Sequence, residues 1–328
     1  MPASSTPSRY LNPAELAPLR HMVFASRRAV VGHYAGKHAS PQRGHSVEFQ
    51  DYRDYTPGDP LGEIDWKVYG RSDKLFIKLF EHQSDMTVNL LVDASASMGY
   101  RGLGGSGVGD LGQGKRKRRR RLFANSQASK PPTSKYDHAC AMTSAIAYLV
   151  TQQQDKVGIG IAQQGLQHSV RAAGTYPHLH RLVGVMESVQ PQGPANLAAA
   201  IHAAARQAKR KGMLLIFSDL EENQDAVLSA LSNFLHRGHE VIVFHTLHAD
   251  ELKLPDLSEA VFVDSESGRE IRVNVEDIRA DYETKMNSHV DQWRRVLMAR
   301  GVDYNLVSTA MPYQETLRQY LFSRASLM

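Results

Sequence analysis

Three oxygen-bearing side chains lie at the end of one apolar run. Asp93, Ser95 and Ser97 form a D-x-S-x-S pattern where the run TVNLLVDAS at residues 87–95 ends. Asp219 closes a second apolar run at residues 212–219. Carboxylate and hydroxyl oxygens, completed by water, suit octahedral Mg²⁺ or Mn²⁺. We therefore expect a metal site at these four residues, while the simpler alternative is that they only cap and turn a strand–helix junction.

The elements that would position these residues alternate along the chain. Apolar runs typical of buried strands are separated by segments with helical spacing. The expected strands are 87–95, 155–163, 166–173, 212–219 and 240–247, and the expected helices are 136–153, 175–189, 195–210 and 225–238. This order predicts an α/β fold with a doubly wound, mainly parallel sheet. Ligands of such sheets bind beyond the carboxyl ends of the strands, where Asp93 and Asp219 are expected.

Further elements are expected on both sides of this alternation. Residues 11–35 suggest a short amphipathic helix, and residues 48–81 a small irregular β region. After the alternating part we expect a hairpin at 260–274, a helix at 275–300, a strand at 302–309 and a helix from 312 to about 325. We therefore divide the chain into an N-terminal helix and β region (1–85) and a main domain (86–328).

The segment at about residues 100–134 interrupts the pattern. It is rich in glycine, then basic, then rich in Ser and Pro, and it is much longer than an ordinary strand–helix loop. Residues 115–121 read KRKRRRR, and they account for the net charge of +5, because the rest of the chain has 32 basic and 34 acidic residues. We expect an insertion whose deletion (residues 101–132) leaves the fold intact. The basic run Lys115–Arg121 could steer an acidic partner, or it could be a solvated loop. It lacks the interleaved aromatic residues of a nucleic-acid platform, so nucleic acid is not expected as a partner.

Composition excludes several classes of protein. The 328 residues are 42% hydrophobic, which is enough for a core, and the single cysteine, Cys140, cannot form an internal disulfide. No apolar run approaches the length of a transmembrane helix, and no signal segment is visible, so we expect a cytoplasmic protein. The match G-x-x-x-x-G-K at 109–115 continues with Arg116 in place of Ser or Thr, which argues against a phosphate-binding loop.

The D-x-S-x-S turn with Asp219 resembles the metal-ion-dependent adhesion site of von Willebrand factor A domains. In that family a threonine adds a further ligand, in a stretch similar to Gly193-Pro194-Ala195-Asn196-Leu197. Ala195 stands where the threonine would be, and Asn196 is a further candidate ligand through its amide oxygen. The resemblance implies a metal whose open position is completed by an acidic side chain of a partner.

A second motif, at residues 48–66, indicates a more specific family. Residues 48–59, EFQDYRDYTPGD, followed by Ile64-Asp65-Trp66, resemble the signature of the family called domain of unknown function 58. The signature residues are Glu48, Asp51, Tyr52, Arg53, Tyr55, Gly58, Asp59, Asp65 and Trp66. They suit either a recognition surface or a buried cluster of ion pairs and aromatic rings. The resemblance implies an adaptor that works with a MoxR-type AAA+ ATPase in the assembly or maturation of protein complexes.

Three functions remain open on the sequence. The first is a non-enzymatic protein-binding module with a divergent Mg²⁺ or Mn²⁺ site. The second is a metal-dependent hydrolase or phosphatase that uses the same carboxylates, with Ser95 and Glu221 as candidate nucleophile and base. The third is a metal-free scaffold, which the alanine at position 195 favours.

Overall fold

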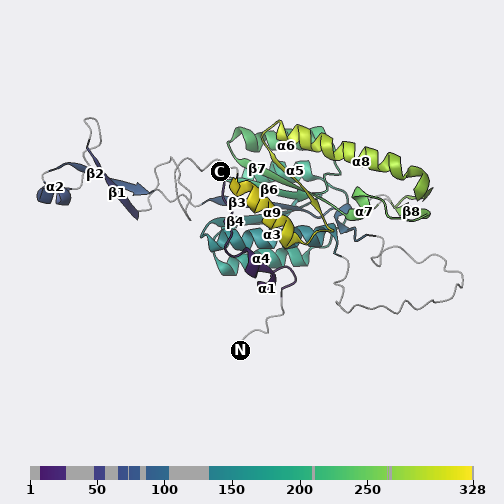
Figure 1. Ribbon diagram of the computed structural model, residues 1–328, viewed down its shortest axis with the longest axis horizontal. Helices are drawn as coiled ribbons and strands as arrows, with labels where there is room; N and C mark the ends of the chain where they lie inside the picture. The colour runs from purple at the N-terminus through teal and green to yellow at the C-terminus, as the bar shows by residue number, and fades with distance from the viewer. Residues whose placement is uncertain are drawn as a thin grey trace, which may run out of the picture. The chain divides into compact units, whose positions relative to one another are not determined.

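The apolar run that ends in Asp93 forms the strand β3 (Thr87–Asp93), an inner strand of a six-stranded sheet in the computed structural model (Figure 1). The structure describes residues 8–26, 48–55, 66–72, 74–81, 86–102, 133–208, 211–263, 265 and 268–326. β3 pairs in parallel with β4 (Lys156–Gln163) on one side and β6 (Met213–Ser218) on the other. Its last four residues are all buried, as expected for a strand covered on both faces.

The sheet has the strand order β10-β7-β6-β3-β4-β5. Its remaining strands are β5 (Gly165–Ala173), β7 (Glu240–Leu247) and β10 (Asp303–Ser308). All neighbours are parallel except β5, which runs antiparallel to β4. This topology confirms the predicted doubly wound, mainly parallel α/β fold. The chain moves from β3 to β4 on one side and later to β6 on the other, so the strand order reverses between β3 and β6.

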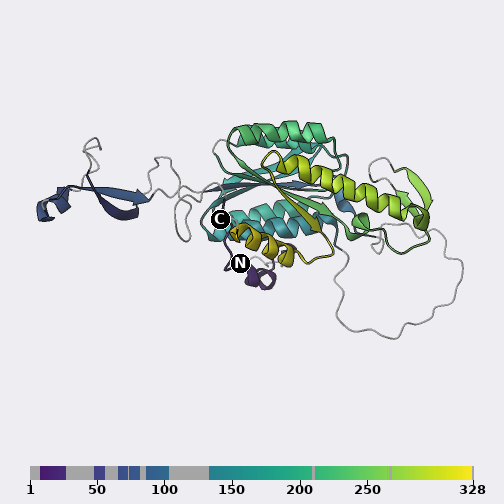
Figure 2. The same cartoon turned by 45° about the horizontal axis from the view of Figure 1, so that its top comes forward.

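Helices cover both faces of the sheet (Figure 2). One face carries α3 (Lys135–Gln152), α4 (Tyr176–Ser188) and α9 (Tyr313–Ser326), and the other carries α5 (Leu197–Gln207), α6 (Gln224–His236) and α8 (Val275–Met298). On the second face, Trp293 and Leu297 of α8 join the apolar cluster formed by α5, α6 and the strands.

Short polar side chains fix where several of these helices begin. Ser134 Oγ accepts the backbone N–H of Asp137, and the Asp137 carboxylate accepts the N–H of Ser134, which makes a capping box for α3. The side chains of Asn196, Asn223 and Asn274 each accept one backbone N–H at the start of α5, α6 and α8, and so cap these helices.

The first described residues pack with the main domain. The chain divides into two compact units, and the larger unit takes in the described residues up to Phe24 together with those from Thr87 onward. Tyr10, Leu19 and Phe24 are buried, and Tyr10 donates a hydrogen bond to Asp137 at the start of α3. The prediction placed these residues with the small β region in an N-terminal part (1–85). In the structure they belong to the larger unit, because their apolar side chains are buried there.

The predicted helix at 11–35 is shorter in the structure. Residues Pro13–Leu16 form α1, and Ala17–Leu19 form the 3₁₀ turn η1, after which residues 22–26 have no helical structure. Pro18 lies near the start of η1 and cannot donate a backbone hydrogen bond to a continuing helix. Residues 27–35 lie outside the described part of the chain.

The smaller unit lies within Ala25–Met86. Its strands β1 (Glu48–Asp54) and β2 (Phe76–Glu81) pair antiparallel, and α2 spans Trp66–Ser72. The two strands agree with the small β region expected from the sequence.

Three short elements extend the main domain between β7 and α8. They are α7 (Ala249–Leu252) and the hairpin strands β8 (Glu259–Val263) and β9 (Glu270–Asn274). The insertion predicted at about 100–134 falls mostly on residues 103–132, including Lys115–Arg121, which lie outside the described residues. Within the described ranges, no helix is both long enough and apolar enough to cross a membrane.

Candidate functional site

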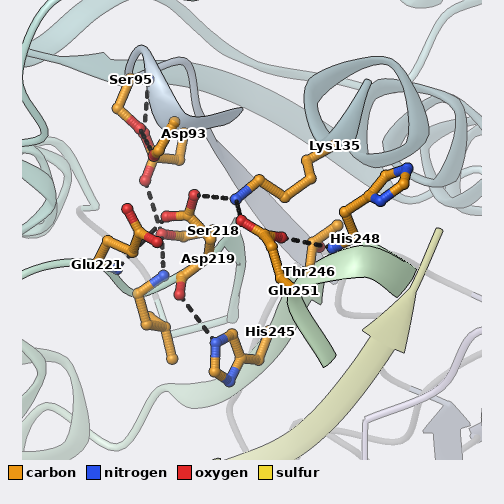
Figure 3. Close-up of polar contacts among 12 residues, drawn as sticks. Asp93, Ser95, Lys135, Ser218, Asp219, Glu221, His245, Thr246, His248 and Glu251 are labelled. Atoms are coloured by element: carbon orange, nitrogen blue, oxygen red, sulfur yellow. Dashed lines mark hydrogen bonds and ion pairs between the residues drawn. The ribbon is translucent and has the colours of Figure 1, made fainter. Parts of the chain in front are cut away.

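Asp93 and Asp219, the two carboxylates predicted to bind a metal, lie at the carboxyl ends of β3 and β6, where the strand order of the sheet reverses. Val92 of β3 lies opposite Phe217 of β6, so the next residues, Asp93 and Ser218, are neighbours at this edge. Ser218 Oγ donates a hydrogen bond of 2.6 Å to Asp93 Oδ2 (Figure 3). Asp219 follows directly, and the parallel pairing of the two strands thus brings both predicted acids to one edge.

Asp93 is bound on both carboxylate oxygens. The backbone N–H of Ser95 donates to Asp93 Oδ1 at 2.9 Å, while Oδ2 accepts the Ser218 hydroxyl. Burial and, to a smaller extent, the nearby charge of Asp219 together raise the pKa of Asp93 to about 7, against the lowering effect of these hydrogen bonds. The hydroxyls of Ser95 and Ser97 lie 3.2 Å apart, and both serines are buried. The structure therefore brings all three D-x-S-x-S side chains into one polar cluster.

Asp219 is paired with a lysine that the sequence did not single out. Lys135 Nζ lies 2.8 Å from Asp219 Oδ2 and 2.6 Å from Glu251 Oε1. The side chains of Lys135 and Asp219 have no exposed surface, and that of Glu251 is 19% exposed. Burial acts to lower the pKa of Lys135, but the neighbouring carboxylates outweigh it and hold this pKa above its usual value. Lys135 is therefore a buried ammonium. We call Lys135, Asp219 and Glu251 the carboxyl-edge cluster.

The buried histidine at this edge has both ring nitrogens engaged. His245 Nε2 lies 2.9 Å from the Asp219 carbonyl oxygen, and its Nδ1 lies 2.7 Å from the Tyr304 hydroxyl. Burial lowers the pKa of His245 to about 4, so the ring is neutral at pH 7. These contacts use the ring to join β7 to β10 and to the residue after β6, away from Ser95.

The loop that carries Ala195 and Asn196 packs directly against the D-x-S-x-S turn. The N–H of Ala96 donates to the Gly193 carbonyl, and the N–H of Gln192 donates to the Ala94 carbonyl. Asn196 Oδ1 accepts the N–H of Ala199 at 3.1 Å and so caps α5. The amide oxygen proposed as a compensating ligand therefore serves as a helix cap.

The Glu222 carboxylate, from the loop after β6, contacts the start of α5. Its Oε2 accepts the N–H of Leu197 at 2.6 Å, and its Oε1 accepts that of Ala198 at 3.3 Å. A carboxylate at this place is stabilised by the free N–H groups and the dipole of the helix. Glu222 ties the loop after β6 to the loop before α5.

The predicted Mg²⁺ or Mn²⁺ site stays a prediction, and the donors as arranged do not fit it. Both carboxylate oxygens of Asp93 accept hydrogen bonds from the protein, and Asp219 Oδ2 faces an ammonium group. Ala195 supplies no hydroxyl, and the Asn196 oxygen caps a helix. Across the residues that the structure describes, no group of three or more His, Cys, Asp or Glu side chains is placed to hold a metal ion.

The signature residues of the smaller unit are only partly described. Glu48, Asp51, Tyr52 and Arg53 lie on β1, and Gly58, Asp59 and Asp65 fall outside the described residues. The Trp66 side chain is 59% exposed and meets Tyr69 edge-on at 6.1 Å, while Tyr55 is partly buried. Whether these residues form a recognition surface or a buried cluster stays a prediction.

Sequence reasoning missed Lys135, Ser218 and Glu251. Lys135 is the first residue of α3, and a positive charge there is disfavoured by the helix dipole. That unfavourable position is the signal that could have marked Lys135 as a residue held for another purpose. Glu251 has no comparable signal in the sequence, because it lies 116 residues after Lys135 along the chain.

The sequence of the chain matches one family model and several relatives. The model of the family described as "Protein of unknown function DUF58" matches residues 51–106 and 122–292, which is more than half of the chain. The uncharacterized protein Rv1480 of Mycobacterium tuberculosis is 25% identical over 321 residues, covering 95% of this chain and 90% of that protein.

Solved structures offer more distant likenesses. BatB of Bacteroides thetaiotaomicron, a conserved hypothetical protein, has 15% identity and a TM-score of 0.42, with 74% of this chain and 99% of that chain covered. A von Willebrand factor type A structure from Catenulispora acidiphila has 10% identity and a TM-score of 0.33, with 51% and 34% covered. Both scores are below 0.5, so neither likeness bears on function.

Proposed function

The chain belongs to the DUF58 family of proteins of unknown function, and we propose that it is a non-enzymatic protein-binding module whose partner docks at the carboxyl edge of the sheet. The observation that carries the proposal is the place of the polar cluster. Asp93 and Asp219 lie at the point where the strand order reverses, which is where open α/β sheets bind their ligands.

Exposed loops surround this cluster and provide a surface for a partner. The loops follow β3, α4, β6 and β7, and the first three are linked by the backbone and Glu222 hydrogen bonds described above. We call six exposed residues of these loops the rim: Arg101, Gln192, Pro194, Asn196, Glu221 and Asn223. The rim is polar and mixed in charge, and the buried cluster beneath it fixes the ends of the loops. Such a surface suits recognition of another protein.

The contacts of the two histidines at the carboxyl edge, His245 and His248, support binding over hydrolysis. A hydrolase that used Ser95 would need a base to take up its proton. His245 is engaged with Asp219 and Tyr304, and His248 Nδ1 accepts the N–H of Asp250. Ser95 Oγ instead lies against Ser97 Oγ.

The basic run gives the expected partner its chemistry. The described chain leaves the sheet edge at Gly102 and returns at Thr133, and the N–H of Lys135 donates to the Tyr100 carbonyl across this gap. The seven cations of Lys115–Arg121 begin 13 residues after Gly102 and are therefore tethered to the rim. We propose that they steer an acidic protein surface toward it. The family resemblance suggests a MoxR-type AAA+ ATPase as that partner, and the cytoplasmic location stays a prediction.

Binding to a purified MoxR-type ATPase tests the proposal directly. We would measure association by biolayer interferometry for the wild type, for Gln192→Glu on the rim and for Gln154→Glu after α3, at the opposite end of the sheet. The added negative charge on the rim should weaken binding to an acidic partner, whereas the same change at Gln154 should not. Added salt should slow the association of the wild type.

Two results would contradict this function. Equal binding by both variants would remove the rim from the interface. Turnover of generic phosphate or ester substrates by the wild type, lost in Ser95→Ala, would favour the hydrolase instead.

A further inference from the structure

The buried ammonium of Lys135 needs an explanation of its own. Its first carboxylate partner, Asp219, directly follows β6, and its second, Glu251, lies on α7 (Figure 3). The two partners lie 84 and 116 residues away along the chain. Folding therefore brings one cation and two carboxylates together from three separate elements.

The start of α3 gains nothing from a lysine. Ser134 and Asp137 already satisfy the capping box of this helix, and the helix dipole disfavours a cation in the first turn. Moving an ammonium into the interior is also costly unless carboxylates compensate it. Lys135 is thus explained by the carboxylates that it faces at the end of the sheet.

Both carboxylate oxygens with which Asp219 could bind a divalent ion already have partners in the protein. Lys135 Nζ lies 2.8 Å from Asp219 Oδ2, and Asp219 Oδ1 accepts the N–H of Glu221 at 3.4 Å. A second cation beside the ammonium would be repelled, and this repulsion is strong in a buried site. The hydroxyls of Ser95 and Ser97 pair with each other, and Asp93 is bound by Ser218 and Ser95. The same donors that suggested a metal are therefore satisfied within the protein.

We propose that Lys135 is the built-in cation of this edge, that it replaces the divalent metal, and that the chain folds and presents its rim without Mg²⁺ or Mn²⁺. The part concerning the rim rests on the protein-binding function proposed above. The part concerning the metal is independent of any partner.

Glu251 completes the arrangement by covering the ammonium. Its Oε1 contacts Lys135 Nζ, and its Oε2 accepts the N–H of His248 at 2.6 Å, which fixes the short helix α7 over the cluster. An acidic side chain of this chain therefore already occupies the open side of the cation. A partner would meet the outer rim residues and not a vacant coordination position.

Metal binding by the isolated full-length chain tests the proposal. After treatment with EDTA, the wild type should give no calorimetric heat with Mg²⁺ or Mn²⁺, and its melting temperature should not change when either ion is added. Lys135→Ala removes the ammonium and leaves the carboxylates of Asp219 and Glu251 around the vacated space. This variant should bind Mn²⁺, and the ion should raise its melting temperature by several degrees.

Matched variants make the result specific. Lys285→Ala removes an exposed lysine of α8 and should behave as the wild type. Lys135→Ala combined with Asp219→Ala should lose the gained Mn²⁺ binding.

The wild type and Asp93→Ala can together overturn the proposal, even if Lys135→Ala does not fold. Saturable Mg²⁺ or Mn²⁺ binding by the wild type that is lost in Asp93→Ala would show a true metal site. Failure of Lys135→Ala to bind Mn²⁺ while it remains folded would show that the ammonium does not stand in for a metal. Neither result would decide whether the rim binds a protein, which the interferometry experiment tests separately.

Discussion

Two buried cations lie at opposite ends of the same sheet. At the carboxyl end, Lys135 pairs with Asp219 and Glu251. At the amino end, Arg324 of α9 lies 2.6 Å from Glu240 and 3.2 Å from Asp303, the first residues of β7 and β10. We call these last three residues the amino-edge cluster. Each cluster holds one basic and two acidic side chains.

The two clusters differ in what they join. The Arg324 guanidinium also lies over the Phe24 ring, 5.6 Å from its centroid, and donates a hydrogen bond to the Tyr320 hydroxyl, so it links the N-terminal segment, α9 and the sheet. Lys135 instead links the start of α3 to the end of β6 and the short α7, beside the polar turn of Asp93. A buried ion pair alone therefore does not identify a functional site. Its place in the topology separates a structural clamp from a candidate binding edge.

The largest expected effect is on the amino-edge cluster. Arg324→Met should lower the free energy of unfolding by about 3–5 kcal/mol, because Glu240 and Asp303 stay buried without the compensating guanidinium. Urea denaturation followed by circular dichroism measures the loss. Arg318→Met on the same helix, whose side chain is exposed, is the control and should change stability little. Equal effects of the two variants would show that the amino-edge cluster is no clamp.

A smaller loss is expected at the carboxyl edge. Lys135→Met should lower the free energy of unfolding by about 3 kcal/mol, since the partly exposed Glu251 can turn toward water when the ammonium is removed. The same denaturation experiment, repeated with Glu251→Gln and the double variant, should give non-additive losses because the two side chains are in contact. Additive losses would mean that the two side chains do not interact as the structure has them.

The buried imidazole of His138 differs from both cations, because it is neutral at pH 7. Burial lowers the pKa of His138 on α3 to about 4, and its Nε2 has no hydrogen-bond partner. The unfolded chain therefore binds a proton near pH 6.5 that the folded chain does not, so this contribution to stability is present above pH 6.5 and lost toward pH 4. At pH 5 the loss should be about 2 kcal/mol. Denaturation of wild type and His138→Gln between pH 7 and 5 measures it, and parallel pH profiles would refute it.

The smallest effect on stability is expected from the inserted segment. Deleting residues 101–132 should leave the melting temperature almost unchanged, because the segment is poor in apolar residues. The Tyr100–Lys135 hydrogen bond holds the two ends close enough for a short connection. A large drop in melting temperature, measured by differential scanning calorimetry, would show that the segment contributes to the core.

Local patterns predicted the sheet well because its elements have strong periodicity. The buried run of β3, the alanine-rich α5 and the capped α6 are all near the predicted positions. For the described residues 11–26 the prediction of one helix failed, because the short helix α1 and the 3₁₀ turn η1 stand in its place. Apolar spacing alone did not account for Pro18 or for burial against α3.

The candidate site was predictable only where a motif was continuous in sequence. Asp93, Ser95 and Ser97 are close along the chain, and Asp219 could be added because it also ends a strand. Lys135 and Glu251 could not be paired with them, because that contact depends on where α3 and α7 meet the sheet edge. Sequence chemistry thus suggested acidic ligands without revealing the cation already beside them.

The irregular strand β5 has a consequence for self-association. It is the outer antiparallel strand, its pairing with β4 shifts register twice, and His168 adopts a positive φ of 43°. Such irregularities break the even row of backbone donors and acceptors that a flat outer strand would offer to another chain. Polar and charged side chains, including Arg171, also lie along it. This edge is therefore a poor template for intermolecular β-pairing, and the sheet is protected there against aggregation by strand addition.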